Sequence, residues 1–173
     1  MSAAVPWSVP VRLSEVQRGA RTHALVADEA ARARIARLLD LPALLRLEGA
    51  VTVAPWLDGA ELTGRWSADL QQLCGVTAEP FDAPAAGEFT VRVVPPDSRA
   101  APAPDAEISL DPDAEDPPDV LEGETMDLGA YLVEHLALAL DPFPRAPGVE
   151  WEPPAADAEP SPFAALAALK RDG

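Results

Sequence analysis

Residues 45–71 read LRLEGAVTVAPWLDGAELTGRWSADLQ, and this stretch decides the fold. It holds two runs in which apolar or small residues alternate with polar ones, on either side of Asp58-Gly59. That dipeptide is typical of a tight hairpin turn. The residues that share one face are Leu45, Leu47, Gly49, Val51 and Val53 in the first run and Leu62, Gly64, Trp66, Ala68 and Leu70 in the second. The period of two predicts an antiparallel hairpin with one buried and one solvated face.

Further strands are predicted on both sides of this hairpin. The alternation from Phe89 to Val93 predicts a strand over 88–94, and a shorter strand is expected over 76–78. Residues 5–13 also alternate, with prolines on the second face, which indicates an edge strand because proline cannot donate to a ladder. The strands near 5–13, 45–53, 60–72 and 88–94 should form one curved antiparallel sheet, or a half-open barrel.

Two helices are predicted to flank the sheet, which makes the fold class α+β. The first, over 28–40, opens with Asp28, whose charge suits the positive end of the helix dipole. The second, over 127–140, has Asp127 as its N-cap. The apolar faces are Ala31, Ile35, Leu38 and Leu39 in the first helix and Leu128, Tyr131, Leu132, Leu136 and Leu140 in the second. A short amphipathic helix is expected over 162–170.

The chain changes character between the last strand and the second long helix. Residues 97–124 are rich in Pro, Asp, Glu and Ala and hold few large apolar side chains, so an acidic, disordered insert is predicted there. Its central part, 98–122, should be mobile and dispensable for folding. We expect a single domain over residues 1–145, followed over 146–173 by a Pro-rich linker and the short helix.

The charge of the chain is strongly negative and unevenly placed. The net charge is −16, and residues 1–100 contribute only −2 of it while residues 101–173 contribute −14. One interpretation is a solvated region that keeps the protein soluble. The other is a surface for a basic partner such as a ribosomal protein. Free nucleic acid should be repelled by the acidic half, because phosphate binding needs clustered Lys and Arg.

A search for catalytic or metal-binding groups finds little. His23 and His135 are the only histidines, and neither lies in a recognised nucleophile–base motif. Cys74 is the only cysteine, which excludes an intrachain disulfide and leaves a thiolate zinc site without enough ligands. Nothing near Cys74 in the sequence predicts a lowered thiol pKa. The prediction is therefore a chain without catalytic residues, metal or cofactor.

Three arginines on the first predicted helix form the one candidate contact site. Arg32, Arg34 and Arg37 lie within two turns and outside the predicted apolar stripe. One interpretation is a solvated face balanced by neighbouring acidic residues. The other is a contact site for ribosomal RNA, whose binding would be weak and sensitive to salt.

Three short segments carry a resemblance to a known family. They are Leu73–Phe81 (LCGVTAEPF), Met126–Glu134 (MDLGAYLVE) and Leu138–Arg145 (LALDPFPR). In this order the chain resembles the YceD-like family of large ribosomal RNA subunit accumulation proteins, and its closing residues 162–170 are similar to the alphaproteobacterial members. Thr77 stands where many members have a second cysteine. The family motif positions in this chain are Cys74, Thr77, Asp127, Leu128, Gly129, Glu134 and Pro142, and Thr77 is the one that departs from the family pattern.

The resemblance implies a cytoplasmic, non-enzymatic factor that supports the accumulation of large-subunit ribosomal RNA. The implied partner is a ribosomal protein or a pre-ribosomal particle, with a weak contact to ribosomal RNA and no small-molecule substrate. The single cysteine fits a reducing compartment, no signal peptide is evident, and the apolar stretch 128–140 is too short to span a bilayer. Two alternatives stay open: an acidic inhibitor that mimics nucleic acid, and an RNA-processing enzyme.

Overall fold

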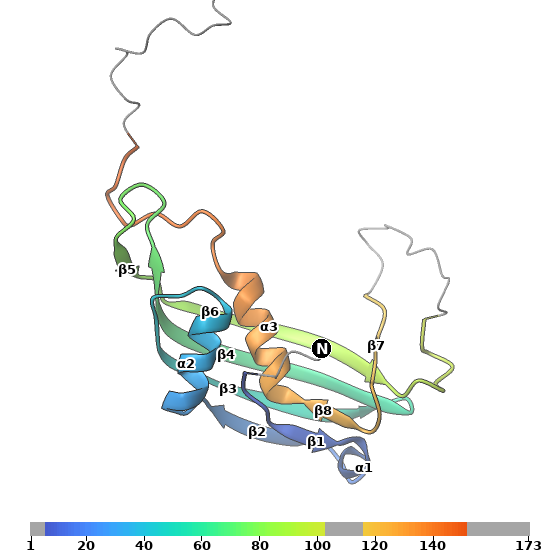
Figure 1. Ribbon diagram of the computed structural model, residues 1–173. Helices are drawn as coiled ribbons and strands as arrows, with labels where there is room; N and C mark the ends of the chain where they lie inside the picture. Colours follow the sequence, from blue (N-terminus) through green and yellow to red (C-terminus); the bar gives the residue numbers. More distant parts are fainter. Residues whose placement is uncertain (1–5, 103–115, 152–173) are drawn as a thin grey trace, which may run out of the picture.

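The computed structural model describes residues 6–102 and 116–151. Its elements are β1 (Pro10–Arg12), α1 (Leu13–Val16), β2 (Arg21–Val26), α2 (Glu29–Leu38), β3 (Ala43–Trp56), β4 (Gly59–Leu73), β5 (Pro80–Asp82), β6 (Ala85–Val94), β7 (Asp119–Val120), β8 (Thr125–Asp127) and α3 (Leu128–Ala139). The large sheet has the order β2-β3-β4-β6-β7, with β5 paired to β4, and β1 and β8 form a second, two-stranded sheet. The predicted α+β class is confirmed, and the mostly antiparallel sheet is not closed into a barrel (Figure 1).

The long hairpin of β3 and β4 is the centre of the sheet, as residues 45–71 predict. Its register pairs Trp56 with Gly59, so the two turn residues are Leu57 and Asp58, one position earlier than the predicted Asp58-Gly59 turn. Leu57 takes a positive φ of 51°, as the first residue of a tight hairpin turn does. A Cβ on Gly59 would lie 1.9 Å from the carbonyl oxygen of Val93, so only glycine lets β6 approach here.

The buried face of the hairpin follows the predicted alternation along β4 but departs from it at the start of β3. Leu45 is expected in the core but is 58% exposed, and Leu44 is buried in its place. The register between β3 and β4 shifts between Leu44 and Arg46, and this irregularity moves one residue out of the alternation. Arg46 then lies beside Asp69, with which its guanidinium forms an ion pair.

The N-terminal edge of the sheet differs from the prediction. Residues 5–13 were expected to form an edge strand of the large sheet, and this is wrong: only Pro10–Arg12 is a strand, and it pairs with β8. The edge position belongs instead to β2, which pairs with β3 and which sequence analysis missed. In β2 Leu25 is buried and the neighbouring Val26 is 69% exposed. These two residues are the only clear buried–exposed alternation in the strand, which is too short a pattern to predict it.

The second half of the sheet is β6, which contains the predicted strand over 88–94. The expected strand over 76–78 does not form. Those residues belong to a turn that closes when the Ala78 amide donates to the Cys74 carbonyl oxygen at 2.8 Å, and Ala78 has a φ of +56°. The strand that follows this turn is β5.

Both long helices lie over the same face of the sheet, so the prediction of two flanking helices is confirmed (Figure 1). α2 packs through Ala31 and Ile35, whereas Leu38, expected in its apolar stripe, is 57% exposed. α3 packs more deeply, and Leu128, Leu132 and Leu136 are fully buried. The absence of a side chain at Gly49 of β3 admits Leu132, since a Cβ there would lie 2.7 Å from its Cδ1.

The predicted acidic insert is shorter than expected at its C-terminal end. Residues 116–124 are described, and they contain β7, which pairs in parallel with β6 at Val93 and Val94. Leu121 is buried, and its amide donates to the Val94 carbonyl oxygen at 2.9 Å. The boundary at 124 is therefore wrong. Residues 103–115 and the expected C-terminal helix over 162–170 lie outside the described residues.

Candidate functional site

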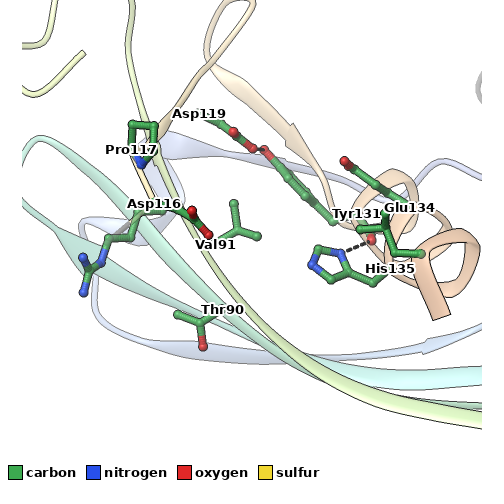
Figure 2. Close-up of a pocket in the computed structure, with 10 residues that line it drawn as sticks. Thr90, Val91, Asp116, Pro117, Asp119, Tyr131, Glu134 and His135 are labelled. Atoms are coloured by element: carbon green, nitrogen blue, oxygen red, sulfur yellow. Dashed lines mark hydrogen bonds between the residues drawn. The ribbon is translucent and has the colours of Figure 1, made fainter. Parts of the chain in front are cut away.

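A groove of about 530 Å³ lies between β6, β7 and α3 (Figure 2). β6 contributes three consecutive residues, α3 contributes one flank, and the segment that leads into β7 closes the far side. The lining residues are Thr90, Val91, Arg92, Asp116, Pro117, Asp119, Tyr131, Glu134, His135 and Leu138. Because they come from three separate parts of the chain, the sequence analysis could not find this groove.

Two aromatic side chains of α3 give the groove a firm wall. The hydroxyl of Tyr131 donates to Asp119 Oδ2 at 3.1 Å, and burial together with the charge of Asp119 raises the pKa of Tyr131 above its ordinary value. His135 stacks on Phe89 of β6, with ring centroids 4.1 Å apart. His135 Nδ1 also lies 2.8 Å from the Tyr131 carbonyl oxygen, which can only accept, so Nδ1 carries the hydrogen. Both rings are held in place by the fold.

The charge of the groove is negative. Three carboxylates, Asp116, Asp119 and Glu134, line it together with one arginine, Arg92. That arginine is engaged elsewhere, since its Nε donates to Glu61 at 3.1 Å and its guanidinium lies 5.1 Å from the centre of the Trp56 ring. Glu134 is exposed and has no hydrogen-bond or ion-pair partner among the described residues. The groove therefore suits a positively charged ligand.

The three arginines of α2 are spread around the helix and do not form one patch. Arg32 Nη1 donates to the Ala27 carbonyl oxygen at 2.8 Å, and Arg34 Nε donates to the Pro6 carbonyl oxygen at 2.7 Å. At 100° per residue these two side chains flank the buried stripe on opposite sides, and Arg37 projects away from it. Arg37 is the one with no hydrogen bond or ion pair among the residues described.

Cys74 lies in a turn that anchors the segment after α3. The next amide, that of Gly75, donates to the Pro144 carbonyl oxygen at 2.8 Å, and Pro142 lines a pocket with Gln72 and Leu73 at the end of β4. Hydrogen bonds from the Ala146 backbone and from the Thr77 hydroxyl and backbone lower the pKa of the buried Cys74 thiol to about 6. The expectation that nothing lowers this pKa is therefore wrong, because the Ala146 backbone comes from a distant part of the chain.

The Asp127-Leu128-Gly129 motif is a structural junction. Asp127 caps α3 by accepting from the amides of Gly129 and Ala130, and it also accepts from the Val9 amide at 2.8 Å. A Cβ on Gly129 would lie 2.7 Å from the Trp7 carbonyl oxygen, so glycine allows the N-terminal segment to cross α3. The motif positions thus support the fold, with the exception of Glu134, which faces the groove (Figure 2).

Among the described residues, no group of three or more His, Cys, Asp or Glu side chains could hold a metal ion. Across residues 6–102 and 116–151, no helix is long and apolar enough to cross a membrane.

Comparison with known proteins supplies the family. No curated protein matches this chain, and no solved structure does. A family model described as Large ribosomal RNA subunit accumulation protein YceD matches residues 62–170. The matched region runs from β4 through the Cys74 turn, β6 and α3, so it contains both the groove and the structural motifs. This match covers more than half of the 173 residues, and the chain belongs to the YceD family.

Proposed function

We propose that this chain supports the accumulation of large-subunit ribosomal RNA as a non-enzymatic factor that binds a ribosomal protein or a pre-ribosomal particle in the cytoplasm. The observation that carries the proposal is the match to the family model over residues 62–170, whose description names this role. The net charge of −16 supports a basic protein as the partner, because ribosomal proteins must be basic enough to bind RNA.

A binding role agrees with the state of the polar groups in the groove. Tyr131 and His135 are tied to Asp119 and to a backbone carbonyl, and their rings form a rigid wall. Such fixed side chains favour recognition of a partner surface, since little side-chain entropy is lost on binding.

Depletion of the chain in its natural host tests the proposal. The ratio of large-subunit to small-subunit ribosomal RNA should fall, and subunit profiles on sucrose gradients should lose mature large subunits. Re-expression of the wild-type chain should restore both. An unchanged ratio after depletion would refute the proposed function.

A limited RNA contact through α2 is a further part of the proposal. Arg32 and Arg34 donate to backbone carbonyls, so Arg37→Gln is the informative variant, with the exposed Arg18→Gln as its matched control. If Arg37 contacts a phosphate, its replacement should weaken association with pre-ribosomal particles and reduce the salt slope by about one. Equal behaviour of the two variants would remove α2 as the RNA contact.

A further inference from the structure

The outer edge of β6 borders the acidic groove, and within residues 6–102 and 116–151 most of its length has no strand partner. β7 pairs with β6 only at Val93 and Val94, and no other described strand lies on that side. The Val94 carbonyl oxygen accepts from the Leu121 amide on the outer side. Since backbone groups alternate in direction along an antiparallel strand, the N–H and C=O groups of Thr90, Glu88 and Ala86 also point outward.

We propose that this edge binds an extended, basic peptide segment of a protein partner. The segment adds a strand to the outer edge of β6, in line with β7, which pairs there with Val93 and Val94. The Lys and Arg side chains of the segment meet the carboxylates of the groove. The inference rests on the proposed function, and it names the chemistry of the partner segment and the surface that receives it.

The side chains around the edge favour a basic strand. Successive side chains of an added strand would point to opposite faces of the sheet. On the helix face they would meet Glu134 and the exposed Leu138, and Asp119 lies where the added strand would reach β7. On the solvated face they would meet Glu88, and Arg92 on the same face is already paired with Glu61. Carboxylates on both faces repel RNA and attract lysine and arginine, so a basic peptide fits this site better than a nucleic acid.

The opposite edge of the sheet supplies an internal control. In β2 the Ala24 backbone groups also point outward, because the Ala27 amide bonds to the Leu47 carbonyl oxygen and directions alternate from there. Ala24 does not line the groove between β6, β7 and α3. The two edges therefore offer the same backbone pattern with different surroundings.

Two proline variants test the backbone part of the proposal. Thr90→Pro removes an outward donor at the β6 edge, and Ala24→Pro does the same at the β2 edge. Neither backbone N–H donates to a neighbouring strand of the sheet, so both variants should fold. The probe is a short amidated peptide of alternating lysine and valine, with a glutamate–valine peptide and a short uridine RNA as comparisons.

The expected result is binding of the lysine–valine peptide alone, with hydrogen-exchange protection at Glu88 and Thr90. Thr90→Pro should weaken that binding about tenfold, and Ala24→Pro should leave it unchanged. Glu134→Lys should weaken it several-fold and flatten its salt dependence, unlike Glu15→Lys on the distant helix α1.

Several outcomes would overturn the inference: no binding of the basic peptide, protection at β2 in place of β6, equal loss in both proline variants, or tighter binding of RNA at the same edge. The protection pattern uses the wild-type chain, so it decides the question even if a proline variant does not fold. If Thr90→Pro and Glu134→Lys restore ribosomal RNA in depleted cells as well as wild type does, the edge is not the partner site and the proposed function stands. If depletion leaves ribosomal RNA unchanged, the proposed function fails whatever the peptide does.

Discussion

The two long helices lie on the same face of the sheet, yet they hold their charged residues in opposite ways. α2 buries Ala31 and Ile35 and ties two of its arginines to backbone carbonyls. α3 buries five residues and leaves Glu134 exposed at the acidic groove. A deeply packed helix can carry an exposed carboxylate, because the position of the helix in the fold does not depend on that side chain. In our proposal α3 therefore supplies the binding surface, while α2 covers the core through Ala31 and Ile35.

The largest effect should come from the core side of α3. Leu132→Ala removes a fully buried side chain seated over Gly49, and we expect a loss of about 3 kcal/mol in the free energy of unfolding. Leu138→Ala on the same helix should cost almost nothing, because Leu138 is 76% exposed. Urea denaturation of both variants measures the two losses in the free energy of unfolding. Similar losses in both would show that α3 is not the deeply packed helix.

The next largest effect should come from the N-caps of the two helices. Asp127→Ala removes the acceptor for the Gly129, Ala130 and Val9 amides, and we expect a loss of about 2 kcal/mol or more. Asp28→Ala removes one bond, to the Ala31 amide, and should cost about 1 kcal/mol. Thermal and chemical unfolding should rank them in this order. A reversed order would contradict the role of Asp127 as a junction between α3 and the N-terminal segment.

The arginines of α2 should give smaller effects that distinguish stability from binding. Arg34→Gln loses the bond to the Pro6 carbonyl oxygen and should lower the free energy of unfolding by about 0.5 kcal/mol. Arg37→Gln should leave stability unchanged, since its side chain has no such bond within the described part of the chain. Paired unfolding curves check this. A loss for Arg37→Gln equal to that for Arg34→Gln would show that α2 does not divide its arginines in this way.

The last prediction depends on pH and concerns the turn that anchors the end of α3. The thiol of Cys74 has a pKa of about 6 in the folded chain against 9.0 for the free group, so folding favours the thiolate. Its contribution to stability is complete above pH 9 and disappears as the pH falls through 6. The stability difference between wild type and Cys74→Ser should therefore grow from pH 6 to pH 9. Thiolate absorbance should titrate near pH 6 in the folded chain. A difference that is flat with pH would refute the lowered pKa.

Much of the fold followed from local patterns. The alternation along residues 60–70 and the starts of the two helices at Asp28 and Asp127 depend on a few neighbouring residues and formed as predicted, whereas the hairpin turn formed one residue earlier than predicted, at Leu57-Asp58. The error at Leu45 came from one irregular position in the register, which alternation alone cannot reveal. The choice of β2 over residues 5–13 as the sheet edge depended on competition for the same partner strand, β3, which no local pattern encodes.

The sequence by itself determined the class of the fold, its central hairpin, the starts of its helices and the acidic balance of the chain, because these depend on neighbouring residues and on composition. Only the tertiary structure decided which distant residues come together. The groove joins β6, β7 and α3, the Cys74 pKa depends on the distant Ala146 backbone, and Gly129 is needed because the Trp7 carbonyl crosses it. Each of these depends on a distance between residues far apart in the chain, and such distances exist only once the chain has folded.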